Sequence, residues 1–249
     1  MIYLKSRAEI DKMRESGRIV ARTLRLVSAQ IAPGVTPRQL NDIAQRHIEE
    51  EGGVPSFLGY RGFPAATCIS VNEVVVHGIP TDEPLKEGDI IGLDFGVVKD
   101  GWHADGAWTY PVGKISEAAQ RLLNVSKESL YQGISKAKAG NRIGDISAAV
   151  QKYLESNGYG VVRDLVGHGI GRKLHEEPAA VPNFGKAGKG ELLKEGMTIC
   201  IEPMVNEGTY EVETLPDQWT LVTRDGKLSA HFEHTVAITR DGPQILTQE

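Results

Sequence analysis

The chain has 249 residues, a length at which one domain of helices and strands can still enclose a single hydrophobic core. Apolar residues make up 40% and charged residues 24%, as in ordinary globular proteins, and the net charge of −5 argues against broad nucleic-acid binding. The two cysteines lie in β-patterned runs that suit reduced thiols, and no apolar run approaches the roughly 18 residues of a membrane span, so we expect a cytoplasmic protein.

Two helices and three strands are predicted in the first half of the chain. Ser6 and Glu9 form a capping box before a helical pattern that ends near the turn at Pro33-Gly34. Thr36 caps a second helix, which starts with a proline and is stopped by the glycines at 52–53. Alternating and β-branched runs then predict strands at roughly 67–76, 89–98 and 102–110.

The second half repeats this order. From about Ser116 a long helix is predicted, then a break at 140–141 and a helix stopped at 157–158. The sequence Leu-Lys-Glu-Gly occurs identically at 85–88 and 193–196, and a carboxylate stands six residues beyond each of its glycines. The chemically important positions therefore take part in the repeat.

This repeat predicts a single α/β (α+β) domain over residues 1–249. It would consist of two similar halves, about 1–112 and 113–249, related by a pseudo-twofold axis. We expect the strands of both halves to form a curved, mostly antiparallel sheet with the helices outside it.

Two aspartates are predicted to face each other across a hairpin. Asp94 interrupts an apolar strand, and Asp100-Gly101 is a strong signal for a two-residue turn. With those residues at the tip, position 94 pairs with position 107, so Asp105 lies diagonally opposite Asp94 on the same face, roughly 7–8 Å away. A three-residue loop would place Asp105 on the other face, so this prediction depends on the turn.

Glu202 and Glu233 occupy the corresponding places in the second half. Four carboxylates converging in a sheet interior cannot all stay ionised without cations, whereas two divalent ions would cancel their charge. His168 lies among three glycines that allow close backbone approach, which suits a metal ligand as well as it suits a glycine turn with an incidental histidine. An oxygen-rich set with one nitrogen favours Mn²⁺, Fe²⁺, Co²⁺ or Zn²⁺, and a pair of such ions can activate water for hydrolysis.

The other histidines differ in what their positions indicate. His77 and His175 each lie three residues before a proline, at matching places of the two halves, and are candidates to contact substrate. His103 and His231 precede candidate ligands by two residues and share their strand face, which leaves open whether either supports those ligands. His234 follows Glu233 and should point the other way.

Over essentially its whole length the chain resembles the type I methionine aminopeptidases, in the form found in bacteria. The motifs that carry this resemblance are Ser70–Pro80, Gly167–Gly171, His175–Pro178 and Thr198–Met204. The resemblance implies the pita-bread fold, and it implies a metallo-aminopeptidase that removes the initiator methionine from nascent proteins when the second residue is small.

The resemblance also implies roles for individual residues. Asp94 would hold one metal ion, His168 and Glu202 would hold the other, and Asp105 and Glu233 would bridge the two ions. The metals would be Co, Mn, Fe(II) or Zn.

The substrate-binding residues follow from the resemblance too. His77 would contact the substrate near the scissile amide, His175 would steady the tetrahedral intermediate, and Glu202 would also transfer a proton from the attacking water. The methionine side chain would lie in an apolar pocket that draws on Tyr60, Phe63, Cys68 and Trp219.

Further features are implied by the resemblance alone. A monovalent cation would bind near Asn72, Val74 and Ser229, and nascent polypeptide N-termini and a transient ribosome contact would be the partners, without membrane or direct nucleic-acid recognition. Two positions depart from the family pattern: Gly106 replaces a Thr or Ala, and Leu174 replaces an aromatic residue before His175.

Two other functions fit parts of the pattern. A proline-specific relative, such as an aminopeptidase P or a prolidase, would carry a large additional N-terminal domain. A metal-free pita-bread protein that only binds peptides or ribosomes would usually have lost ligands, whereas all five candidate positions here hold competent side chains.

Overall fold

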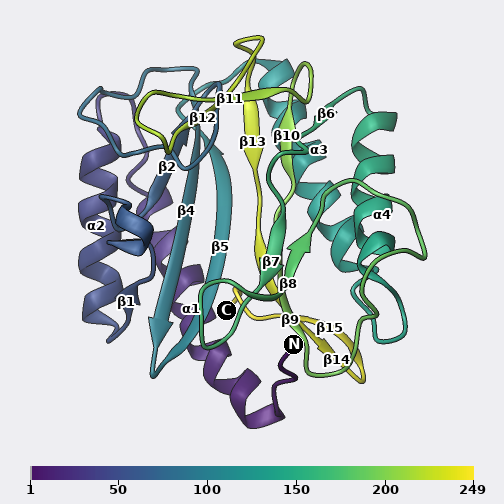
Figure 1. Ribbon diagram of the computed structural model, residues 1–249. Helices are drawn as coiled ribbons and strands as arrows, with labels where there is room; N and C mark the ends of the chain where they lie inside the picture. The colour runs from purple at the N-terminus through teal and green to yellow at the C-terminus, as the bar shows by residue number, and fades with distance from the viewer. Residues whose placement is uncertain (1) are drawn as a thin grey trace.

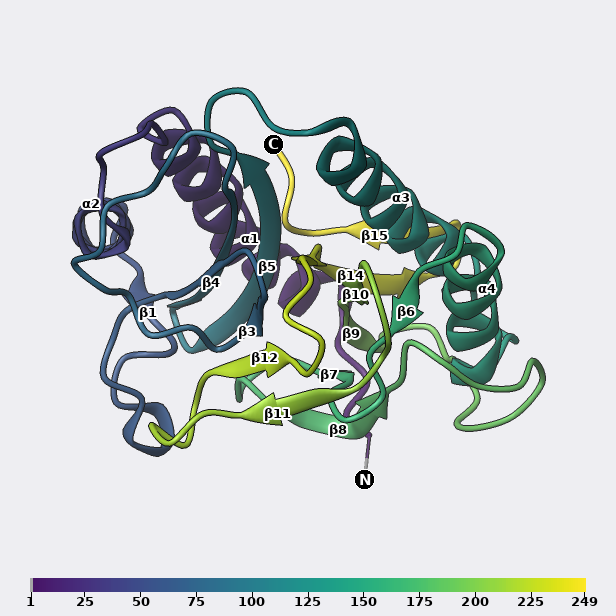
Figure 2. The ribbon, with the colours of Figure 1, turned by 90° about the horizontal axis from the view of Figure 1, so that it is seen from above.

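Four α-helices flank antiparallel strands in the computed structural model, which describes residues 2–249 (Figure 1). Seen from above, α1 and α2 lie beside one part of the strands, and α3 and α4 lie beside the other (Figure 2). None of the helices in the described part of the chain is long and apolar enough to cross a membrane. The helices are α1 (Arg7–Ser28), α2 (Pro37–Glu50), α3 (Glu117–Ile134) and α4 (Ile143–Ser156).

Capping residues determine where α1 and α2 begin. Ser6 and Glu9 make the predicted capping box of α1, and Thr36 makes another with the glutamine three residues on. The helix α1 ends at Ser28, earlier than the predicted end near Pro33, and the chain continues as a tighter turn in which Gln30 N donates to Val27 O at 2.9 Å.

The strands pair antiparallel in four sheets within residues 2–249. Their orders are β1-β4-β2 with β5 on β4, β13-β10-β6, β11-β12-β3, and β15-β14-β9-β7-β8. The strands are β1 (Val54–Pro55), β2 (Cys68–Val71), β3 (Val74–Val76), β4 (Ile90–Lys99), β5 (Trp102–Pro111), β6 (Gly160–Val161), β7 (Gly167–Gly169), β8 (Glu176–Val181), β9 (Thr198–Ile201), β10 (Met204–Asn206), β11 (Val212–Thr214), β12 (Leu221–Thr223), β13 (Ser229–His231), β14 (His234–Thr239) and β15 (Gly242–Ile245).

The hairpin of β4 and β5 has the predicted turn. Lys99 pairs with Trp102, and Asp100 and Gly101 at the tip both have positive φ, 51° and 76°, as a two-residue turn of type I′ requires. Asp94 therefore pairs with Ala107, which confirms the predicted register.

The strand β5 also joins the two parts of the molecule. Its Ala107 exchanges backbone hydrogen bonds with Glu233, which lies between β13 and β14: Glu233 N donates to Ala107 O at 2.9 Å. Thr235 Oγ accepts from Asp105 N at 2.9 Å and donates to Asp105 O at 2.8 Å. Thr109 Oγ makes the same pair of bonds to the backbone of His231. We call this line of contacts between β5 and residues 231–235 the central seam.

A separate hydrophobic cluster lies on each side of the central seam. One cluster packs α1 and α2 against β4 and β5, with Val20, Leu40 and Phe95 among its buried residues. The other packs α3 and α4 against β9 and β14, with Leu122 and Val236 among its members. The seam is thereby held between two cores, which fixes the side chains that it carries.

The substitution Thr235→Val tests whether the seam stabilises the fold. Valine keeps the shape of this fully buried side chain but leaves the N–H and C=O of Asp105 without their partner. We expect the free energy of unfolding in urea to fall by about 1–3 kcal/mol. Thr214→Val, on the exposed face of β11, is the matched control and should change it by less than about 0.5 kcal/mol. Equal effects of the two substitutions would contradict this account.

Candidate active site

The five candidate metal ligands line one cavity of about 190 Å³, together with His77 and His175. They arrive there from different elements: β4, β5, β7, the residue after β9, and the link between β13 and β14. In chain order these residues are Asp94, Asp105, His168, Glu202 and Glu233.

Two groups of donor atoms are each compact enough to hold a metal ion, because the atoms within a group all lie within 4.8 Å of one another. The first combines Asp105, His168 and Glu233 with the thiol of Cys200, and the second combines Glu202 and Glu233 with His231. Glu233 belongs to both groups. Asp94 belongs to neither, although it lines the same cavity.

Buried polar atoms in and beside this cavity fit divalent cations. Asp94 Oδ1, Glu233 Oε1 and His231 Nε2 are buried without a hydrogen-bond partner among the described residues. Such atoms are rare in folded proteins, and each one destabilises the fold unless something satisfies it. Cations of the kind that carboxylates and imidazoles bind would satisfy all three.

Burial and mutual repulsion perturb the four carboxyl groups. Burial raises the pKa of Asp105 to about 7. Burial, followed by the charge of neighbouring carboxylates, raises the pKa values of Asp94, Glu202 and Glu233 well above their ordinary values. Without a cation these groups retain protons at pH values where exposed carboxyl groups are ionised.

Close backbone packing at the neighbouring glycines and a hydrogen bond from the ring fix the orientation of the His168 side chain. A Cβ at Gly167 would collide with the carbonyl oxygen of Cys200, and one at Gly169 would collide with the backbone of Glu177. His168 Nδ1 lies 2.9 Å from the carbonyl oxygen of Gly169, so it carries the proton and donates it there. Nε2 is then free to bind a metal ion.

The two substrate-contact candidates are neutral imidazoles. Burial lowers the pKa of His77, which follows β3 with a φ of 57°. Burial, followed by the nearby His168 and Arg61, lowers the pKa of His175. His175 also stacks on Tyr60, whose hydroxyl lies 2.9 Å from His175 Nδ1.

The four residues expected in a methionine pocket, Tyr60, Phe63, Cys68 and Trp219, all line the cavity. Phe63 and Trp219 meet edge to face, with their ring centres 5.1 Å apart. The cavity is also lined by Leu174, the departure noted before His175, and by residues that the sequence did not assign to the pocket: Phe57, Arg61, Val76, Leu165, Val166 and Met204.

The remaining predicted positions do not line the cavity. Gly106 is closely packed, because a Cβ there would lie 3.1 Å from Val20. Asn72 and Ser229, the candidate monovalent-cation residues, are adjacent: Ser229 N donates to Asn72 O at 2.9 Å. His234 points away from Glu233, as expected, and its Nδ1 lies 2.8 Å from the hydroxyl of Thr247.

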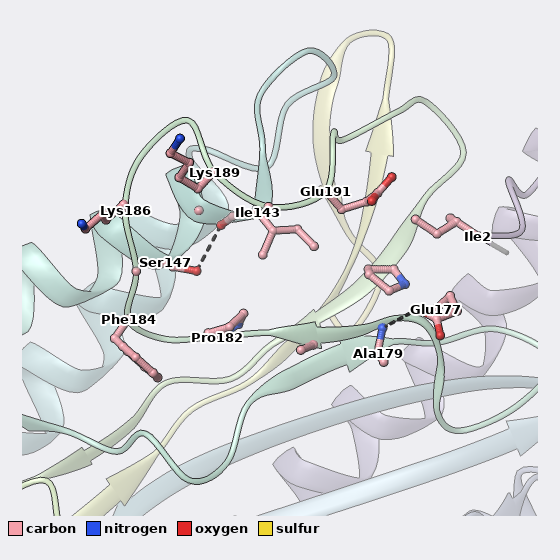
Figure 3. Close-up of a pocket in the computed structure, with 15 residues that line it drawn as sticks. Ile2, Ile143, Ser147, Glu177, Ala179, Pro182, Phe184, Lys186, Lys189 and Glu191 are labelled. Carbon is pink, nitrogen blue, oxygen red and sulfur yellow. Dashed lines mark hydrogen bonds between the residues drawn. The ribbon is translucent and has the colours of Figure 1, made fainter.

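A larger hollow of about 610 Å³ lies between α4, β8 and the segment 182–191 (Figure 3). Apolar side chains such as Phe184 and Ile143 line it, with Lys186, Lys189 and Glu191 around them. It contains none of the candidate catalytic or metal-binding residues. Converging titratable groups, rather than volume, therefore indicate the active site.

Comparisons with known proteins find similarity over almost the whole chain. A model of metallopeptidase family M24 matches residues 11–240. The methionine aminopeptidase of Clostridium perfringens (strain 13 / Type A) is 54% identical over 247 residues, covering 99% of each chain. The crystal structure of methionine aminopeptidase from Rickettsia prowazekii has a TM-score of 0.98 at 43% identity, covering 99% of this chain and 100% of that one.

More distant structures share only the fold. The prolidase of Pyrococcus furiosus has a TM-score of 0.80 at 22% identity, and the match covers 99% of this chain but 65% of that chain. Together with the close structural match, this confirms the pita-bread fold that the sequence led us to expect.

In protein freed of metal by chelation, Glu233→Gln should become more stable relative to the wild type as pH rises. Burial raises the pKa of Glu233 well above its usual value. Between its unfolded and folded pKa values, the folded protein holds a proton that the unfolded chain has lost, so wild-type stability falls with rising pH. One group contributes up to about 1.4 kcal/mol per pH unit, and glutamine contributes nothing because it does not titrate.

The measurement is the free energy of unfolding of both proteins in urea and chelator, from about pH 5 to pH 8. Because the histidines are common to both proteins, their own opposite pH dependence cancels in the difference. A difference that does not change with pH would contradict the clustering of buried carboxylates. Saturating divalent cation should reverse the order and make the wild type the more stable protein.

Proposed function

The chain belongs to metallopeptidase family M24, and from this premise we propose that it is a methionine aminopeptidase. It hydrolyses the first peptide bond of nascent proteins and releases the initiator methionine when the second residue is small. The observation that carries this proposal is the convergence of four buried carboxylates and His168 on the cavity that also holds His77 and His175.

Membership of the family implies the use of divalent metal, and we propose two ions for this chain. Asp94 would hold one ion, His168 and Glu202 the other, with Asp105 and Glu233 shared between them. When bound, such ions polarise the substrate carbonyl and generate a nucleophile from water at neutral pH. Co, Mn, Fe(II) and Zn all suit this donor set.

The protein's own groups perform the remaining steps. Glu202 takes the proton of the attacking water and returns it to the departing amine, because its carboxylate opens onto the same cavity. His77, as a neutral imidazole beside the carboxylates, binds the substrate near the scissile amide.

The hydrogen bond between Tyr60 and His175 supports the role that we propose for His175. If the tyrosine hydroxyl donates to Nδ1, the neutral ring carries its proton on Nε2. That N–H can donate to the oxyanion that develops as the peptide carbonyl becomes tetrahedral.

The apolar part of the cavity fits one methionine side chain. Phe63, Cys68 and Trp219 offer aromatic and sulfur surface, which interacts favourably with a thioether. A cavity of about 190 Å³ has room for one such side chain. The second residue must then pass between the carboxylates and the histidines, which excludes long side chains.

The proposal also covers the location of the enzyme, its partners, a further cation and its domain organisation. We place the enzyme in the cytoplasm, acting on nascent chains during a transient contact with the ribosome, and we propose a monovalent cation near Asn72, Val74 and Ser229. Residues 1–249 would act as one catalytic domain, whose halves, about 1–112 and 113–249, each supply two helices and two of the four carboxylates.

Hydrolysis of Met-Ala-Ser, compared with an Ala-Pro peptide, tests the function directly. We expect the metal-loaded enzyme to cleave Met-Ala-Ser, to leave the Ala-Pro peptide intact, and to lose activity in chelator and regain it with added metal. Preference for the Ala-Pro peptide would favour a proline-specific peptidase, and binding without hydrolysis would favour a peptide-binding protein.

Met-Ile-Ser is the matched control peptide for second-residue selection. Steric exclusion beside the reacting bond should lower its kcat/KM by about 10²-fold relative to Met-Ala-Ser, since small misplacements at a reacting centre cost that much. Comparable values for the two peptides would mean that the proposed restriction does not exist.

The substitution His175→Ala should lower kcat by about 10²- to 10³-fold and change KM less, because an oxyanion donor acts mainly in the transition state. Tyr60→Phe should produce a smaller fall in kcat, since it only removes the group that fixes the tautomer. His103→Ala is the control, because His103 bonds to Ser56 outside the cavity. An unchanged kcat in His175→Ala would exclude this role.

A further inference from the structure

A buried histidine beside the carboxylates has no role in the mechanism above. His231 ends β13, two residues before Glu233, and is 5% exposed. Its backbone N–H and C=O are both bonded to the hydroxyl of Thr109, at 3.0 and 2.8 Å, and it pairs with Met204 on β10. The central seam therefore fixes the position from which this side chain extends.

The ring of His231 points an unsatisfied nitrogen at Glu202. Its Nε2 is buried without a hydrogen-bond partner in the described part of the chain, and it lies 3.7 Å from Glu202 Oε2. His168 Nε2 lies at the same distance, 3.7 Å, from the other oxygen, Glu202 Oε1. Glu202 thus lies between two imidazoles that approach its two oxygens alike.

The distance of 3.7 Å is too long for a direct hydrogen bond and suits two donors that share an ion. A direct N–H···O bond would be about 2.7–3.2 Å long. Two donors bound tetrahedrally to one ion at about 2.1 Å lie about 3.4 Å apart. The donor atoms of Glu202, His231 and Glu233 also all lie within 4.8 Å of one another, so one ion can reach all three with small side-chain movements.

We propose that His231 binds metal through Nε2, as a nitrogen ligand additional to His168, to the ion that Glu202 and Glu233 hold. The inference rests on the metal centre of the proposed function and adds a ligand to it. Because imidazole suits Zn²⁺ and Co²⁺ better than Mn²⁺, a second nitrogen shifts the preference of that position toward the former ions.

Sequence spacing alone does not create this arrangement. His103 also stands two residues before a candidate ligand, Asp105, but its Nδ1 lies 2.9 Å from the hydroxyl of Ser56. Of the two histidines, only His231 directs an unpartnered nitrogen at the carboxylates. His103 is therefore the matched control for substitution.

The test observes the ring nitrogens of the seven histidines by NMR, in protein labelled with ¹⁵N-histidine and titrated with Zn²⁺. We expect two Nε2 resonances, from His168 and His231, to move to the position of zinc-bound nitrogen, while the resonances of His103 stay in place. His231→Gln assigns its resonance by removing it, and His231→Asn serves if the glutamine variant does not fold.

Zinc affinity, measured by calorimetry, gives a second readout. We expect His231→Gln to lower the zinc affinity of one of the two sites by about 10- to 100-fold, the range seen when supporting groups of a metal site are lost. His103→Gln should leave the zinc affinity of both sites unchanged. In Mn²⁺ titrations the effect of His231→Gln should be smaller.

The outcomes separate this inference from the proposed function. If zinc moves the His168 resonance and leaves His231 unchanged, His231 is not a ligand and the metal centre stands without it. If zinc moves neither resonance, the proposed metal centre fails as well. The number of Nε2 resonances that zinc moves in the wild-type spectrum distinguishes these results, so the test does not depend on the stability of the variants.

Discussion

The burial of four carboxyl groups together, beside the central seam, is the constraint on which the rest of the structure depends. Burial raises the pKa values of all four groups, and the charge of neighbouring carboxylates adds to this at Asp94, Glu202 and Glu233. Such groups are tolerated only if protons or cations neutralise them. Protons would make the cluster inert at neutral pH, whereas divalent cations neutralise it and create a hydrolytic centre. The same unfavourable burial that weakens the metal-free fold therefore favours metal binding and function.

The surrounding fold holds these groups in place without supplying opposite charge. Thr235 and Thr109 bond the backbone of Asp105 and His231 across the seam, so the carboxylates are positioned by main-chain geometry. The histidines of the cavity are kept neutral by burial, which leaves their lone pairs and N–H groups free for metal and substrate. No lysine or arginine among the described residues forms an ion pair with the four carboxylates, which leaves metal ions as their natural partners.

Local chemistry explains what the sequence could predict. The Asp100-Gly101 turn determines the register of β4 and β5, and with it the relation of Asp94 to Asp105. Capping residues determine where the helices begin. The contact of Tyr60 with His175 could not be predicted in this way, because these residues are far apart in the chain and meet only through loops. The same limit applies to Leu165 and Val166 in the pocket wall, whose sequence context carries no periodic or motif signal. It also applies to His103 and His231, which each stand two residues before a candidate ligand but lie in different surroundings.

Anomalous diffraction from crystals grown with Mn²⁺ or Zn²⁺ tests the central claim most directly, because it locates ions independently of activity. The account predicts two peaks roughly 3.5–4 Å apart, enclosed by the four carboxylates and close to Nε2 of His168, with all four carboxylates contacting an ion. Peaks confined to the protein surface, or a cavity without strong anomalous density at saturating metal, would contradict it. The four carboxyl groups would then be neutral acids, and the cavity would be a binding site without a hydrolytic centre.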